Sequence, residues 1–184
     1  MNPTFTLSLC LLAFLVIPAA TIKTKKHNVI LQASSILDDY NKIAFDPNFT
    51  ANLAKYKEGY GDEFDFTNDG CSVPKALAAL FVGYITKYDS DFLPACIQHD
   101  FGYRNSDIAG LDTYDARLKV DEIFRTNMLK ACEAYPPQSI AFVPNISPFS
   151  KDREECQRAA EVYYRGVRVG GATSWQAYGF PSLD

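Results

Sequence analysis

The stretch that decides the fold reads Ala95-Cys96-Ile97-Gln98-His99-Asp100-Phe101-Gly102-Tyr103-Arg104-Asn105. On an α-helix, Cys96, His99, Asp100 and Tyr103 fall at i, i+3, i+4 and i+7, so the four side chains share one face. His99 is one of only two histidines in the chain. A lone helical histidine is more often a packed or surface residue than a general base. Its role therefore depends on what lies opposite.

A second predicted helix, Tyr114 to Ala134, carries a carboxylate within its apolar stripe. The stripe consists of Leu118, Asp121, Phe124, Met128 and Cys132. An ionised carboxylate is costly to bury unless it is paired or hydrogen-bonded. Two interpretations stay open: Asp121 forms a salt bridge with Arg117 one turn back, or it accepts a hydrogen bond from His99. The second would fix the tautomer of His99 and stabilise the imidazolium formed when His99 takes a proton.

A third group of residues lies in the turn Asn68-Asp69-Gly70. The Asp69 carboxylate and an inward-turned Gly70 carbonyl are usable hard-oxygen ligands, and Asp100 adds a second carboxylate. Oxygen ligands favour Ca²⁺ or Mg²⁺ over zinc or copper. An acidic turn alone is more often solvated surface, so that reading is the alternative to a metal site.

The cysteines indicate a disulfide framework. Cys10 lies in an N-terminal apolar run, and four remain: Cys71, Cys96, Cys132 and Cys156. An even number in an exported chain predicts two disulfides, and spacing alone leaves three pairings open. We favour Cys71–Cys96, which would clamp the acidic turn against the helix bearing His99, and therefore Cys132–Cys156. A zinc site is disfavoured because no CxxC pair is present and histidines are scarce.

Helical patterns cover most of the remaining chain, and two-residue alternation rich in β-branched residues is almost absent, so the sequence predicts an all-α fold. We expect short helices over about 28–56, broken near Asp46-Pro47, and a buried helix over 74–88. The helix that ends at Asn105 has Ser90 and Asp91 as cap candidates and Pro94 in its first turn, and Asp112 or Thr113 caps the helix from Tyr114. Ser150 caps a last helix, which has Asp152 and Glu154 in its first turn and ends at Gly170-Gly171.

The N-terminus predicts a targeting segment. The apolar run 7–17 is roughly half the ~20 residues that span a bilayer, and Ala19 and Ala20 suit a signal-peptide cleavage site. An N-terminal membrane anchor is the alternative. Lys25-Lys26 is either a processing site, which makes 21–26 a short propeptide, or a solvated basic patch. The expected organisation is a signal peptide over 1–20 and a single domain over 27–184.

Composition limits the partners. The 184 residues suffice for one domain, and a net charge of −4 with a pI near 5.2 disfavours binding to nucleic acid and simple adsorption to anionic membranes. We expect a monomer. Asn48-Phe49-Thr50 and Asn145-Ile146-Ser147 are glycosylation sequons, to be used only in a host that glycosylates.

Two strings together resemble a known family. Phe66-Thr67-Asn68-Asp69-Gly70-Cys71-Ser72, followed by the stretch from Ala95 to Asn105, is similar to the secreted phospholipases A2 of bacteria and fungi, and the resemblance covers about 64–132. It implies a disulfide-stapled domain with two antiparallel catalytic helices and a calcium-binding loop. His99 matches the general base and Asp121 its carboxylate partner, while the Ca²⁺ ligands match Asp69, the Gly70 carbonyl and Asp100.

The reaction that the resemblance implies is calcium-dependent hydrolysis of the sn-2 ester of a glycerophospholipid, at a membrane surface or on micelles, by a secreted enzyme. The chain departs from the bacterial members in the long segment between Cys71 and Cys96, which bears on substrate preference. The rival interpretation is a catalytically silent secreted protein on the same fold, acting as a binding or surface-structural protein.

Overall fold

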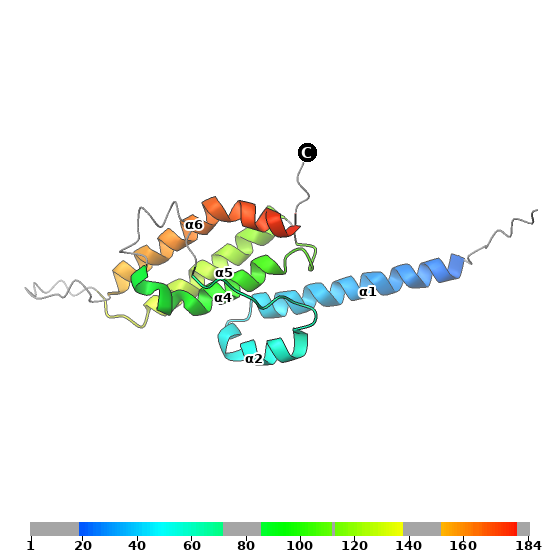
Figure 1. The fold of residues 1–184 in the computed structure, drawn as a ribbon, viewed down its shortest axis with the longest axis horizontal. Coiled ribbons are helices and arrows are strands. Elements are labelled where there is room, and N and C mark those ends of the chain that lie inside the picture. Colours follow the sequence, from blue (N-terminus) through cyan, green and yellow to red (C-terminus); the bar gives the residue numbers. More distant parts are fainter. Residues whose placement is uncertain (1–18, 72–85, 112, 138–151, 180–184) are drawn as a thin grey trace, which may run out of the picture. The chain divides into compact units, whose positions relative to one another are not determined.

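The computed structural model describes residues 19–71, 86–111, 113–137 and 152–179 (Figure 1). Its elements are α1 (Ala19–Ala44), α2 (Phe49–Tyr60), the 3₁₀ turn η1 (Thr86–Tyr88), α4 (Asp89–Arg104), α5 (Tyr114–Cys132) and α6 (Arg153–Gly179). The described residues contain no strand, so the all-α prediction is confirmed. None of the described helices is long and apolar enough to cross a membrane.

The chain divides into two compact units, 1–34 and 35–184, and α1 begins in the first and ends in the second. Of the first unit the structure describes only the helical residues 19–34. The predicted signal peptide therefore lies almost wholly outside the described residues, and its boundary at residue 20 and the propeptide boundary at residue 26 stay predictions.

In the second unit, α4, α5 and α6 lie side by side and build one core (Figure 1). α4 and α5 run antiparallel, because contacts between them pair residues 98 and 99 with residues 127 and 121. Gly102 lets the two helices approach closely, since a Cβ there would lie 2.7 Å from Val120 Cγ1. The predicted pair of antiparallel helices is therefore present.

A second, aromatic core fixes the other side of α4. Phe101 contacts the rings of Phe49 and Phe66 at centroid distances of 5.8 and 4.9 Å. Tyr40, at the end of α1, donates from its hydroxyl to the Gly102 carbonyl at 2.9 Å. Gln98 donates to the carbonyls of the turn that separates α1 from α2. This turn lies where the break near Asp46-Pro47 was predicted.

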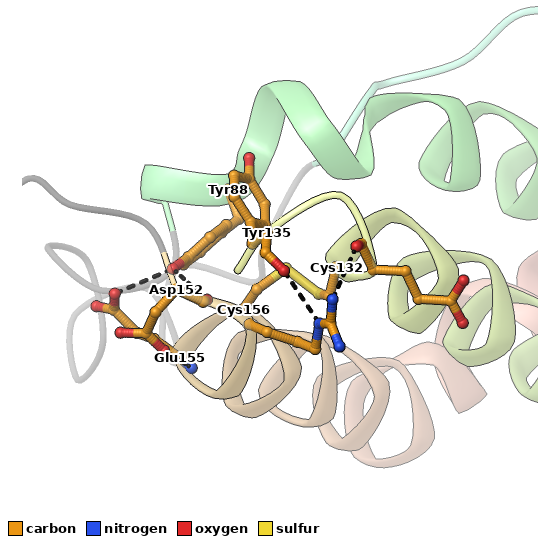
Figure 2. Close-up of a disulfide and its surroundings, with 8 residues drawn as sticks. Tyr88, Cys132, Tyr135, Asp152, Glu155 and Cys156 are labelled. Carbon is orange, nitrogen blue, oxygen red and sulfur yellow. Dashed lines mark hydrogen bonds between the residues drawn. A yellow bond between two sulfur atoms is a disulfide. The ribbon is translucent and has the colours of Figure 1, made fainter. Parts of the chain in front are cut away.

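The junction between α5 and α6 surrounds the Cys132–Cys156 disulfide (Figure 2). The Tyr88 and Tyr135 rings meet edge to face at a centroid distance of 5.9 Å. The Tyr88 hydroxyl donates to Glu155 Oε2 at 3.0 Å. The Arg153 guanidinium donates to the carbonyls of Tyr135 and Glu133, which follow the last turn of α5. The end of α5 is thus attached to the start of α6 by covalent and polar contacts.

Several predicted boundaries need correction. α4 begins at Asp89, directly after η1, so Ser90 and Asp91 lie in its first turn rather than capping it, and Pro94 lies in its second turn. Thr113 caps α5, and its Oγ1 accepts from the Ala116 N–H at 3.1 Å. The helix predicted over 74–88 lies outside the described residues except for its last three, which form η1. Asp112, Asn145 and Ser150 also lie outside the described residues.

The last helix was predicted to end too early. α6 continues through Gly170-Gly171 to Gly179, and neither glycine has the positive φ of a C-terminal cap. Gly171 instead permits close packing, because a Cβ there would lie 2.8 Å from the Tyr103 hydroxyl oxygen. Asp152 Oδ1 accepts from the Glu155 N–H at 2.7 Å, so Asp152 caps α6 rather than lying within its first turn.

Candidate active site

The structure brings His99 of α4 against Asp121 of α5. His99 Nε2 lies 2.8 Å from Asp121 Oδ1, and the side chains are 9% and 0% exposed. The imidazole is packed against Phe124, whose ring centroid is 4.5 Å away. In the tautomer that donates to Asp121 the proton is on Nε2, and the lone pair is on Nδ1. A neutral imidazole held in this way is equipped to take a proton at Nδ1.

Asp121 has more partners than the sequence predicted. Its Oδ1 also accepts from the Tyr103 hydroxyl at 2.8 Å, and its Oδ2 accepts from Arg168 Nη1 at 2.6 Å. Arg117 Nε lies 3.5 Å from Oδ2. Both interpretations of Asp121 therefore hold at once, because each carboxylate oxygen has its own donors. Burial raises the pKa of Asp121, but the hydrogen bond and charge of His99, with the hydrogen bonds from Tyr103 and Arg168, outweigh burial and hold this pKa below its usual range.

The acidic turn lies against the same helix. The Asp69 N–H donates to Asp100 Oδ2 at 2.7 Å, and Gly70 adopts the left-handed conformation with φ +64°. The disulfide Cys71–Cys96 follows directly, with a Cα–Cα distance of 5.2 Å. Both disulfides thus have the pairing favoured from the sequence. The structure thus places the Asp69-Gly70 turn against Asp100, the residue that follows His99 on α4.

These donors fit a hard cation. The described residues hold no cluster of three or more His, Cys, Asp and Glu side chains suited to a metal. The predicted set instead combines two carboxylates with the Gly70 carbonyl, and Ca²⁺ accepts such mixed oxygen shells. Burial raises the pKa of Asp100, although the Asp69 N–H opposes this shift, so a cation would stabilise its charged form. Asp69 is paired with Arg104, whose Nη2 lies 2.6 Å from Oδ2.

Asn105 holds the segment that leads into this turn, a role that the sequence analysis missed. Its side chain is fully buried; Oδ1 accepts from the Asp65 N–H at 2.7 Å, and Nδ2 donates to the Asp65 carbonyl at 2.8 Å. An amide that satisfies both backbone groups of one residue mimics a strand ladder. Asn105 therefore fixes the approach to Asp69 from the end of α4.

Arg168 was also missed. It lies 47 residues after Asp121, on the last helix, for which the sequence predicted the ends but no site residue. Tyr103 was placed on the face of His99, but no partner for its hydroxyl followed from helical spacing. The signal that was available for both residues is the buried carboxylate itself, which requires more donors than one histidine supplies.

Comparisons with known proteins identify related sequences. A family model described as prokaryotic phospholipase A2 matches residues 40–171. A protein of Arthroderma benhamiae named secretory phospholipase A2 is 35% identical over 81 residues, which cover 44% of this chain and 48% of that protein. A protein of the same name from Beauveria bassiana is 30% identical over 110 residues, covering 60% and 45%. The chain thus spans about half the length of these curated relatives.

The family match extends from the end of α1 into α6 and includes the acidic turn, both disulfides and the His99–Asp121 pair. It covers well over half of the chain. The chain therefore belongs to the prokaryotic phospholipase A2 family.

Proposed function

We propose that this protein is a secreted, calcium-dependent phospholipase A2 that hydrolyses the sn-2 ester of glycerophospholipids to a fatty acid and a lysophospholipid. The observation that carries the proposal is the buried contact, 2.8 Å long, between His99 Nε2 and Asp121 Oδ1. His99 lies on α4, the helix that also bears Asp100. Membership of the family and the name shared by the two relatives support the same activity.

The reaction needs no protein nucleophile. His99 takes a proton from water at Nδ1 as the water oxygen attacks the ester carbonyl, and Asp121 stabilises the imidazolium. The imidazolium then returns the proton to the leaving alcohol oxygen, so one water is consumed for each ester cleaved. Ca²⁺ held by Asp69, the Gly70 carbonyl and Asp100 would supply positive charge for the lipid phosphate and for the developing oxyanion.

The substrate is expected to be a phospholipid in a membrane surface or micelle. Secretion is supported by the N-terminal apolar run, by two disulfides, and by the names of the relatives. A catalytically silent binding or structural protein would be expected to lack the base or a ligand, whereas His99, Asp121, Asp69 and Asp100 are all present.

A phosphatidylcholine with different labels on its two acyl chains tests the proposal. Vesicles are incubated with the full protein in calcium and in excess chelator, and the released fatty acid is identified. We expect release of the sn-2 chain alone, in calcium alone. Release of the sn-1 chain, or equal release in chelator, would contradict the proposed reaction, and no release from any phospholipid would favour a silent relative.

A further inference from the structure

We propose that Arg168 of α6 is a positioning residue for this reaction: it holds the Asp121 carboxylate in the orientation that accepts from His99. The inference rests on the proposed function. It assigns to the last helix a part in the active site, beyond the histidine and the aspartate.

The two carboxylate oxygens of Asp121 have different hydrogen-bond donors. Oδ1 accepts from His99 and from Tyr103, while Oδ2 accepts from Arg168 Nη1 at 2.6 Å. A carboxylate hydrogen-bonded only through Oδ1 has fewer restraints on rotation about its χ2 axis. The Arg168 contact with Oδ2 adds the restraint that keeps Oδ1 facing the imidazole.

Arg168 rather than Arg117 performs this task. Arg117 Nε is 3.5 Å from Oδ2 and has no hydrogen-bond partner, whereas Arg168 makes a short, charge-assisted bond. Arg117 contributes indirectly, because its Nη2 donates to the Arg168 backbone carbonyl at 2.6 Å. Arg117 therefore holds the helix turn from which Arg168 reaches Asp121.

The Arg168 side chain is itself ordered by its surroundings. It is 15% exposed, and its guanidinium carbon lies 5.0 Å from the centroid of the Tyr114 ring. Tyr114 is the first residue of α5, so the guanidinium bridges the start of that helix and the buried carboxylate. A side chain already held in place loses little conformational freedom on binding Asp121.

The contacts between α5 and α6 explain how Arg168 comes to lie opposite Asp121. The Cys132–Cys156 disulfide attaches the start of α6 to the end of α5, and the antiparallel course of the two helices then returns Arg168 to Asp121. The family match ends at residue 171 and so includes Arg168. The active site thus draws on three helices, of which α6 supplies a group that acts through Asp121.

The test compares Arg168→Met and Arg168→Lys with Arg165→Met, an exposed arginine one turn earlier on the same helix. On phosphatidylcholine micelles we expect kcat of Arg168→Met to fall about tenfold to a hundredfold with KM unchanged, since small misplacements of a catalytic group have effects of this size. Arg168→Lys keeps the charge and should recover part of kcat. Arg165→Met should match the wild type.

Two further measurements separate positioning from a merely structural role. In an Asp121→Asn background, Arg168→Met should change the residual rate less than threefold, because the carboxylate that Arg168 orients is gone. Guanidinium ion added to Arg168→Ala, at concentrations too low to denature, should restore part of kcat. An unchanged kcat in Arg168→Met, an equal loss in both backgrounds, or absence of rescue would overturn the inference.

The coupling between Arg168 and Asp121 is also measurable without catalysis. Urea unfolding compares Arg168→Met, Asp121→Asn and the double variant. The double variant should be clearly more stable than the sum of the two single losses predicts, because the Arg168–Asp121 contact can be lost only once. Additive losses would overturn the inference. This cycle remains informative if the wild type hydrolyses no phospholipid, which would contradict the proposed function instead.

Discussion

Asp121 shows most clearly how one residue serves two purposes. A carboxylate in an apolar stripe suggested a salt bridge or a partner for histidine, and the structure has both. The two functions are compatible because a carboxylate has two oxygens and several acceptor sites. Residue spacing does not resolve individual oxygen atoms, so from the sequence a salt bridge and a histidine partner looked like alternatives.

At Gly171, even a substitution by alanine should disturb the active site. A Cβ at this position would lie 2.8 Å from the Tyr103 hydroxyl oxygen, which donates to Asp121. Gly171→Ala should therefore displace Tyr103, lower the free energy of unfolding by about 1 to 3 kcal/mol and reduce hydrolysis several-fold, even though alanine favours helices. Urea unfolding and the initial rate of fatty-acid release measure the two effects.

Gly59 provides the matched control, since it lies in α2, is exposed and has no atom within 4 Å of an added Cβ. Gly59→Ala should raise the free energy of unfolding by up to about 1 kcal/mol and leave the rate unchanged. If Gly171→Ala behaves in the same way as Gly59→Ala, then close packing is not the reason for the glycine.

At the scale of elements, the sequence predicted helices well where the signals were local. The break between α1 and α2, the Thr113 cap and the start of α5 follow from residues within one turn of each boundary. The end of α6 did not, because Gly170-Gly171 is a termination signal by local chemistry alone. The helix continues beyond it to Trp175, which is buried against Tyr103, and such contacts between distant helices have no sequence period.

The two disulfides join elements with different roles, and they allow a balanced comparison. Cys71–Cys96 closes 25 residues and Cys132–Cys156 closes 24, so loop-closure entropy assigns each about 3 to 4 kcal/mol of stability. Replacing either pair by serine should therefore destabilise the protein to a similar extent. Only the loss of Cys71–Cys96 should also weaken calcium binding, because it frees the Asp69-Gly70 turn from α4.

Calorimetric titration with calcium, at a temperature where circular dichroism finds both double variants folded, makes the comparison. An equal loss of calcium affinity in the two variants would show that the disulfides act through global stability alone. If calcium affinity is retained without Cys71–Cys96, this disulfide is not needed to hold the Asp69-Gly70 turn for calcium.

For the whole molecule, the sequence predicted the pair of helices that carries the chemistry but not the third helix that completes it. His99 and Asp121 were accessible because each sits on a helix with a clear pattern, and the acidic turn because it immediately precedes Cys71. Arg168 and Asn105 act through contacts 47 and 40 residues distant along the chain. Their partners are set by how helices pack, which an amphipathic pattern does not specify.

The most direct test of the account is the initial rate of fatty-acid release from phosphatidylcholine vesicles in calcium by the wild type, His99→Ala and His27→Ala, which replaces the chain's other histidine. We expect His99→Ala to lose about 10²–10⁴-fold in rate, as for removal of a general base, while His27→Ala keeps the wild-type rate. A folded His99→Ala variant that hydrolyses within tenfold of the wild type would contradict the account.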